Sequence, residues 1–429
     1  MGVWYAVVMV RDMNGVITGI GLVTAVGSTL DEVFDAVCDG RSGLRRPPEG
    51  HPVNGVLEVA GIAPEIHPDG LVPGPEWRTV DRHVLMSLRA AADAVADAGL
   101  RVGEDVDPER VACVISGTGG LATFAGQVLR RADKGRLAVS PYLLPGVLPN
   151  MAAARVAIAH GIRGYSSSIA TACASGAQAV AEALRLLRAG EADAVVCGCA
   201  EALLFDVFAE AFGNARALAQ GWADPAEASR PFDRRRNGFV LSEGAAVLVV
   251  ERPELAAARG AAGHAEVLGW GVGTDAHHPT TPRPDGEGPA QSMRRALAGA
   301  GLGPADVGYV NAHGTGTKLG DAAEAAAIRR VFGAAGRPEG PPVSSIKGVT
   351  GHMLGASGAV EVAVCAAALG RGMLPPTRNL DDPDPACALD HVVKQARVER
   401  VDAVLTNSFG FGGHNVSLVL GRAGASGGR

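Results

Sequence analysis

Short apolar runs bounded by glycine alternate with alanine-rich stretches of helical length through most of this chain. The runs are apolar throughout, which is typical of strands that are covered on both faces. Strands are predicted at 111–116, 194–198, 245–250, 307–311 and 403–406, and helices at 84–98, 174–189, 286–300 and 356–369. This alternation predicts an α/β fold. The 429 residues are enough for two or three domain-sized units.

The two halves of the chain contain similar segments in the same order. Arg110–Gly119 reads RVACVISGTG and resembles Asp306–Thr315, which reads DVGYVNAHGT. Ala192–Val195 and Val401–Val404 share Asp-Ala-Val, and each follows a long alanine-rich helical stretch. We interpret the pairs as a duplicated βα unit, with chance resemblance between short strands as the alternative.

Charge and cysteine content exclude some functions. The formal net charge of −6 argues against a general nucleic-acid binder, because phosphate binding needs a basic surface. A local basic patch could still meet an acidic partner. The seven cysteines are odd in number and lack framework spacing, which favours a reducing, cytoplasmic location. For the pair Cys197 and Cys199 we expect strand packing rather than metal binding.

The ends of the chain differ from the rest. Val3–Val10 is an apolar run of eight residues, too short to span a bilayer, and no small-residue cleavage site follows it. We therefore predict neither a signal peptide nor a membrane anchor. Residues 1–12 are expected to be an N-terminal appendage, and residues 423–429 a disordered tail.

Cys173 lies in the motif TACASG at 171–176, directly before a helical run. A cysteine at a tight turn that opens a helix lies against unpaired N–H groups, whose partial positive charge favours the nucleophilic thiolate. Cys173 is therefore a candidate nucleophile, with a buried structural cysteine as the alternative.

Two histidines occupy glycine turns farther along the chain. His313 follows the predicted strand 307–311 in NAHGTGT, and His352 ends the segment SSIKGVTGH. Catalytic groups of α/β proteins gather at the carboxyl ends of strands, although a lone histidine in such a turn is more often a satisfied polar residue. A fourth segment, NSFGFGGHN at 407–415, has a glycine-rich backbone whose N–H groups can point at a ligand.

Zinc binding is an alternative role for a Cys-His-His set. Metal sites bring their ligands in closely spaced pairs, whereas His313 lies about 140 positions after Cys173 and 39 before His352. No metal site is predicted.

In this order, the four segments resemble the β-ketoacyl synthases of the thiolase superfamily. They are most similar to the elongating Cys-His-His synthases of fatty-acid synthesis and to type II polyketide ketosynthases. The resemblance runs from Val16 to Leu420 and includes RPFD at 230–233 and GFVLSEG at 238–244. It implies an α/β thiolase-like fold of two duplicated halves, 13–255 and 256–422, in a five-layer αβαβα arrangement. Each half would carry a mixed five-stranded sheet, with the helices after Cys173 and His352 buried between the sheets.

The resemblance also implies roles for the matching residues. Cys173 would attack an acyl thioester and hold the acyl group covalently. The backbone N–H groups of Cys173 and Phe411 would form the oxyanion hole, and Phe411 would gate the acyl pocket. His313 and His352 would stabilise the enolate that forms when a malonyl thioester loses carbon dioxide. The reaction would be a decarboxylative Claisen condensation that elongates a fatty-acid or polyketide chain.

Further matches surround these groups. Lys347 would pair with Glu361, and the pair would orient His352 rather than move protons. Hydroxyls that match those binding the phosphopantetheine arm belong to Thr315, Thr317 and Thr280, and Phe409 is expected to contact the substrate. No bound cofactor is implied, because the substrates are carried on the phosphopantetheine arm of acyl carrier protein.

Carrier proteins are acidic, so a basic rim should steer them to the site. The candidates by position along the family fold are Arg78, Arg82, Arg130, Arg131 and Lys134, although an exposed charge run is more often only a solvated face. The chain would form a homodimer or a heterodimer with a chain-length-factor subunit. SEGAA at 242–246 looks more like the polyketide type and GGHN at 412–415 more like the housekeeping type. A non-catalytic partner subunit lacks the nucleophile, so the presence of Cys173 favours the active member.

Overall fold

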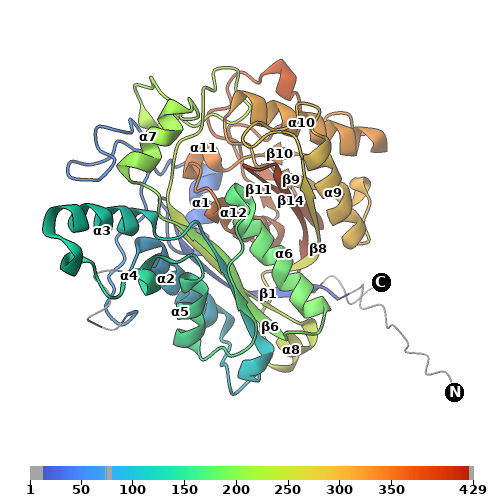
Figure 1. The fold of residues 1–429 in the computed structure, drawn as a ribbon. Coiled ribbons are helices and arrows are strands. Elements are labelled where there is room, and N and C mark those ends of the chain that lie inside the picture. Colours follow the sequence, from blue (N-terminus) through green and yellow to red (C-terminus); the bar gives the residue numbers. More distant parts are fainter. Residues whose placement is uncertain (1–12, 73, 75–79, 425–429) are drawn as a thin grey trace.

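The computed structural model of the protein describes residues 13–72, 74 and 80–424. Its centre is a ten-stranded sheet in the order β10-β9-β13-β14-β8-β1-β7-β6-β4-β5 (Figure 1). The strands are β1 (Gly15–Val23), β4 (Val111–Ser116), β5 (Ser166–Ser167), β6 (Ala194–Glu201), β7 (Gly244–Glu251), β8 (Ala265–Thr274), β9 (Tyr309–Asn311), β10 (Val343–Ser344), β13 (Ala403–Gly410) and β14 (His414–Arg422). Two short ribbons pair β2 (Leu44–Arg45) with β3 (Ala60–Gly61) and β11 (Met373–Leu374) with β12 (Arg397–Val398).

The large sheet consists of two halves with the same pairing pattern. In the first half β4 is parallel to β5 and β6, and β7 is antiparallel to β6 and β1. In the second half β9 is parallel to β10 and β13, and β14 is antiparallel to β13 and β8. The similar segments Arg110–Gly119 and Asp306–Thr315 contain the equivalent strands β4 and β9. The predicted duplication is therefore confirmed at the level of topology.

One feature differs from the prediction of two separate five-stranded sheets. The halves are joined edge to edge, because β1 and β8 pair antiparallel from Gly15 opposite Val267 to Ile17 opposite Ala265. The contact covers only the start of each strand, so the rest of the two sheets can separate and enclose helices between them.

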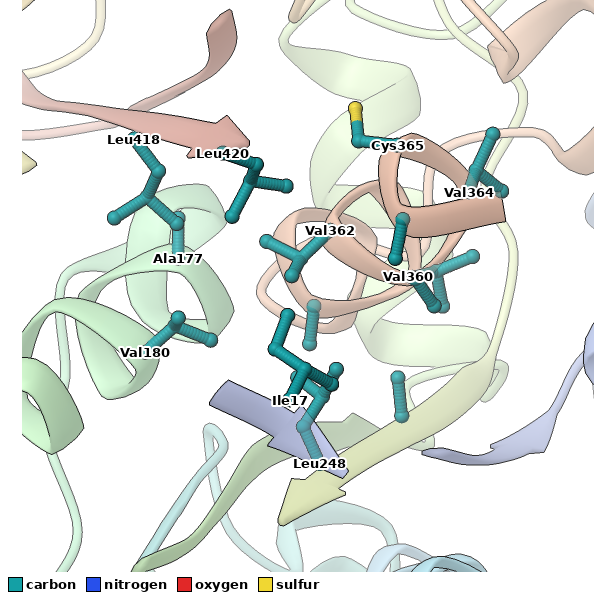
Figure 2. Packing of buried hydrophobic residues seen from close by; sticks show 14 of the residues in the cluster. Ile17, Ala177, Val180, Leu248, Val360, Val362, Val364, Cys365, Leu418 and Leu420 are labelled. Atoms are coloured by element: carbon teal, nitrogen blue, oxygen red, sulfur yellow. The ribbon is translucent and has the colours of Figure 1, made fainter. Parts of the chain in front are cut away.

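The enclosed helices are α6 (Ser175–Arg188) and α12 (Ala356–Arg371), as predicted (Figure 1). Val360, Val362 and Val364 of α12 are all fully buried, although they point in different directions around the helix. The helix itself packs against β7 and β14, which contribute Leu248 and Leu418 to the same core (Figure 2). A helix that is apolar all round is stable only when it is covered on every side. Each such valine contributes about 1.5–3 kcal/mol through its burial.

The outer layers complete the αβαβα arrangement. Helices α2 (Arg82–Ala98) and α5 (Met151–His160) cover the first half, and α9 (Glu287–Gly299) and α10 (Lys318–Phe332) cover the second. The remaining helices are α1 (Leu30–Asp39), α3 (Leu121–Lys134), α4 (Leu143–Val147), α7 (Asp206–Asn214), α8 (Pro253–Ala258) and α11 (Lys347–Thr350). None of the helices in the described ranges is long and apolar enough to cross a membrane.

The predicted appendage at 1–12 lies outside the described residues. At the other end, the predicted tail begins too early. Ala423 and Gly424 form a turn after β14, and the N–H of Gly424 donates to Glu266. The predicted boundary at residue 255 falls within α8, and the division into halves at this point stays a prediction.

Candidate active site

The two central helices begin at a point where their backbones touch. A Cβ on Gly176 of α6 would lie 2.6 Å from the carbonyl oxygen of Gly355, and one on Gly358 of α12 would lie 2.8 Å from the nitrogen of Ala177. These distances exclude a side chain at either glycine. The close approach brings the turn before α6, which carries Cys173, against the loop before α12.

The turn that carries Cys173 is tightly fixed. It is a 3₁₀ turn, Ala172–Ala174, in which Ala172 adopts a φ of 49°. Such a left-handed conformation is unfavourable for a residue with a side chain and persists where the surroundings enforce it. The hydroxyl of Ser175 accepts from the N–H of Thr171 at 2.9 Å and donates to the carbonyl of Ala172 at 2.7 Å.

His352 is the direct partner of the thiol. Its Nε2 lies 3.2 Å from Sγ of Cys173, and its Nδ1 lies 3.2 Å from Oγ of Ser357. Ser357 accepts from the N–H of Met353 at 2.9 Å, so its hydroxyl proton is free to point at Nδ1 or away from it. The ring can therefore hold its proton on either nitrogen while keeping both contacts.

His313 lies beside His352, with ring centroids 5.3 Å apart and planes at 83°. Its main chain is held by Lys347, whose Nζ donates to the His313 carbonyl at 2.6 Å and also pairs with Glu361. The sequence interpretation had this pair orient His352. In the structure its hydrogen bond goes to the other histidine, because β10 and α11 place Lys347 beneath the His313 turn.

Two further carboxylates hold the His313 turn, and sequence reasoning missed both. Glu324 accepts from the N–H of His313 at 2.9 Å and of Gly314 at 2.8 Å, and Asp321 accepts from the N–H of Gly316 at 3.1 Å. Both are fully buried on α10. The signal for these two carboxylates in the sequence was a pair of acidic residues three positions apart on a buried helix face.

Burial sets the electrostatics of the site. It lowers the pKa of His313 and of His352 well below the usual range, and the nearby charge of Lys347 lowers both further. Both imidazoles are therefore neutral at physiological pH, so each can donate from one nitrogen. Burial also raises the pKa of Glu361 and of Glu324 to about 7.

The resting thiol differs from the sequence expectation. Burial, together with the carboxylate of Glu201, raises the pKa of Cys173 to about 12. The backbone N–H groups of Cys173 and Phe411 both hydrogen-bond to the sulfur and oppose that rise. The predicted pair of oxyanion donors is thus brought together. Gly410 permits this, because a Cβ there would lie 2.4 Å from the carbonyl of Thr171.

Cys173, His313, His352 and Phe411 line one cavity of about 710 Å³. The predicted substrate-binding residues all face it, namely Thr280, Thr315, Thr317 and Phe409. The hydroxyls of Thr315 and Thr317 lie 3.1 Å apart. Phe411 is 44% exposed at the cavity wall, consistent with a side chain that can move. The described residues contain no group of three or more His, Cys, Asp or Glu side chains that could hold a metal ion.

The predicted docking residues are less well placed. Arg82 is only partly exposed, because it pairs with the buried Glu243 at 2.8 Å and donates to the carbonyls of Ala63 and Pro64, and its role in docking stays a prediction. Arg130, Arg131 and Lys134 are exposed on α3, and Arg78 lies outside the described residues. The basic side chains at the cavity itself belong to Arg216 and Lys318, which the sequence analysis did not select.

Comparison with known proteins assigns the site to a family. The model "Beta-ketoacyl synthase, N-terminal domain" matches residues 15–256, and "Beta-ketoacyl synthase, C-terminal domain" matches residues 264–381. The 3-oxoacyl-[acyl-carrier-protein] synthase 2 of Synechocystis sp. is 38% identical over 405 residues, which cover 94% of this chain and 97% of that protein.

Two solved structures are similar over the whole fold. The ishigamide ketosynthase/chain length factor has a TM-score of 0.88 and 33% identity, covering 96% of this chain and 100% of that chain. A type II polyketide synthase acyl-carrier protein in complex with its ketosynthase, bound to the hexaketide, gives a TM-score of 0.87 and 29% identity with the same coverage.

Proposed function

Because the chain belongs to the β-ketoacyl synthase family, we propose that it is an elongating condensing enzyme, which joins an acyl group held on Cys173 to a malonyl unit on acyl carrier protein. The observation that carries this assignment is the contact of 3.2 Å between Cys173 and a neutral His352, with His313 beside it. The substrates are carried on phosphopantetheine, and no separate cofactor takes part.

In the first half-reaction Cys173 takes the acyl group. As its sulfur attacks the thioester carbonyl, the thiol proton passes to Nε2 of His352 and then to the departing phosphopantetheine sulfur. The oxygen that becomes negative is stabilised by the N–H groups of Cys173 and Phe411. Since the resting thiol is protonated, His352 acts as the base of this step.

In the second half-reaction His313 and His352 act as donors. The malonyl thioester loses carbon dioxide, and the electron pair of the broken bond forms an enolate whose oxygen accepts from both imidazoles. The enolate carbon attacks the thioester carbonyl on Cys173, and the Cys173 sulfur leaves as a thiolate that takes up a proton from solvent and so restores the resting thiol. Removing one such fixed donor typically costs ~10²–10³ in rate. No strong base is needed, because the carbon nucleophile arises by loss of carbon dioxide.

We also propose a dimer that uses the face formed by α3 to α5. This face exposes large apolar side chains of a kind that monomers rarely leave in water, namely Leu121, Phe124, Val128, Leu129, Leu137, Leu144 and Ile158. The adjacent β5 is an edge strand of the large sheet and pairs only with β4 among the described strands. The partner is a second ketosynthase-like chain, either a copy or a chain-length factor. We place the enzyme in the cytoplasm.

An accurate-mass assay tests the function. Purified protein is incubated with acyl carrier proteins, and malonyl carrier protein is then added. Acylation that is absent in Cys173→Ala, followed by a β-ketoacyl product from the wild type alone, establishes a self-sufficient synthase. Acylation of Cys173 without condensation indicates that a chain-length factor is required. Failure of every acyl donor to modify Cys173 contradicts the assignment.

A further inference from the structure

A row of aromatic rings leads away from the catalytic histidine along one wall of the cavity. The ring of Phe239 lies 5.3 Å from that of His352, Phe212 lies 5.2 Å from Phe239, and Phe208 lies 5.1 Å from Phe212, measured between centroids. The interplanar angles are 89°, 85° and 84°, so each ring meets the next edge to face. We call Phe208, Phe212 and Phe239 the aromatic wall.

All three rings of the aromatic wall line the cavity that contains Cys173. Phe208 and Phe212 come from α7, where their spacing places both on the same side of the helix. Phe411, the gate residue, lies 6.4 Å from Phe212 and extends the same surface. The wall therefore begins beside His352, the partner of Cys173, and continues along the cavity to Phe208.

We propose that the acyl group held on Cys173 is planar and conjugated, a polyunsaturated or aryl chain, and that the aromatic wall selects it over a saturated chain of equal length. This inference rests on the proposed function and names its substrate class. Phe208 and Phe212 are its specificity-determining residues.

Ring chemistry is the first reason. A cluster of edge-to-face rings offers both π faces and positively polarised edges, and such surfaces attract other π systems beyond the effect of buried area. A conjugated chain carries π electrons along its whole length, so each ring of the wall meets a matching surface. A saturated chain gains only burial from the same contact.

Conformational entropy is the second reason. A saturated chain loses rotational freedom about each of its single bonds when it is confined beside rigid rings. A conjugated chain is already planar and extended, so it loses less. The rings themselves have only two side-chain torsions each and are held by one another, which makes the wall a rigid template.

The exposure of the rings is the third reason. Phe208 and Phe212 are only half-buried, whereas Phe239 is 4% exposed. If the rings served only to fill the neighbouring core, the α7 rings would be expected to turn fully into it. They instead leave ring surface facing the cavity, where a bound chain would cover it.

The test compares two eight-carbon donors, octanoyl and all-trans-2,4,6-octatrienoyl carrier protein, each condensed with malonyl carrier protein. The variants are Phe208→Leu and Phe212→Leu, which keep apolar volume but remove the ring. The control is Phe34→Leu on α1, because Phe34 is not among the described residues that line the cavity and its ring contacts Arg371 rather than a ring of the aromatic wall. The measured quantity is the ratio of kcat/KM for the two donors.

We expect the wild type to favour the trienoyl donor, and the ratio to fall about three- to tenfold in each of the two cavity variants. It should change by less than about twofold in the control. Equal rates for both donors in the wild type, or an unchanged ratio in both cavity variants, would overturn the proposal.

A direct binding measurement tests the inference independently of the proposed function. Octanoyl- and octatrienoyl-pantetheine are titrated calorimetrically into Cys173→Ala, with and without Phe212→Leu. Tighter binding of the trienoyl compound that depends on Phe212 supports the wall even if the chain condenses nothing. Equal binding of both compounds refutes it even if condensation is observed.

Discussion

The buried pair Lys347–Glu361 leads to a prediction about the pH dependence of stability. The stability lost by removing Lys347 should shrink as pH falls, whereas the stability lost by removing Glu361 should grow. Both side chains are 1% exposed. Removing one member of a buried ion pair leaves an uncompensated charge and costs about 3–5 kcal/mol. The orphaned group can limit that loss by becoming neutral, and the cost of neutralisation depends on pH in a known way.

In Lys347→Met the remaining carboxyl is already biased toward its neutral form, because burial raises the pKa of Glu361 to about 7 in the intact protein. Protonating an ordinary glutamate costs at most about 3.7 kcal/mol at pH 7 and about 1 kcal/mol at pH 5. A carboxyl whose pKa is higher in the folded than in the unfolded state makes the folded protein less stable as pH rises above the unfolded-state pKa. The deficit of Lys347→Met therefore shrinks on acidification.

In Glu361→Gln the remaining lysine faces the opposite situation. Deprotonating an ordinary lysine costs about 4.6 kcal/mol at pH 7 and about 3.3 kcal/mol at pH 8. A lysine that must be buried in its neutral form makes the folded protein less stable as pH falls, so the stability deficit of Glu361→Gln grows on acidification. The two variants should thus exchange their order of stability at about pH 7.3.

The assay is guanidinium unfolding of both variants and the wild type at pH 6, 7 and 8, with extrapolation to water. Glu104→Gln is the control, because Glu104 pairs with Arg101 on the surface and both side chains are about two-thirds exposed. That control should change stability by less than about 0.5 kcal/mol. Deficits that follow pH in the same direction, or that stay below 1 kcal/mol in both variants, would refute the reasoning.

The remaining predictions concern activity. His313→Ala should lower condensation ~10²–10³-fold while leaving acylation of Cys173 intact, whereas His352→Ala should impair both steps in the accurate-mass assay. Because burial and Lys347 hold the pKa of both histidines well below 6.5, malonyl decarboxylation should stay constant as pH falls through 6.5, and a midpoint there would contradict their neutrality. Ser357→Ala should lower the acylation rate and shift its pH profile, while Ser357→Thr should restore part of the rate if the hydroxyl positions His352. The double variant Arg216→Glu with Lys318→Glu should raise the KM for carrier-bound substrate more than the double variant Arg130→Glu with Arg131→Glu. The opposite order would indicate that the carrier protein docks on α3.

Much of the architecture could be predicted because each strand has its own apolar run in the sequence. β4 matches its predicted limits, since every residue from Val111 to Ser116 is apolar or small and fully buried. β6 and β13 extend past their predicted ends to Glu201 and Gly410, where polar residues and glycines replace the apolar run. Those extensions line the cavity, so the prediction was least complete at the strand ends that form the site.

The structure differs from what the sequence indicates where distant segments decide the outcome. Arg82 looked like a fully exposed base, but it pairs with Glu243, 161 residues away. The state of Cys173 was predicted from its own turn, whereas the pKa depends on burial by α12 and β13. Phe205, Phe208 and Phe212 did leave a local signal at helical spacing, yet only the tertiary contact with Phe239 shows which of them face the cavity.

The duplication explains why the site has its particular division of labour. Each half presents a central helix start and strand ends at the same edge of the sheet, so the fold creates two equivalent sets of positions. The first half uses its helix start for the nucleophile Cys173. The second uses the positions after β9 and before α12 for His313 and His352. In the aligned repeats the position of His313 corresponds to Gly117 after β4, so the first half lacks an imidazole there. Acyl transfer therefore depends on groups from both halves, Cys173 and His352, whereas enolate formation uses two histidines of the second half. The contact at Gly176 and Gly358 brings Cys173 and His352 together. A larger residue at either glycine should therefore impair acylation of Cys173 before it unfolds either sheet.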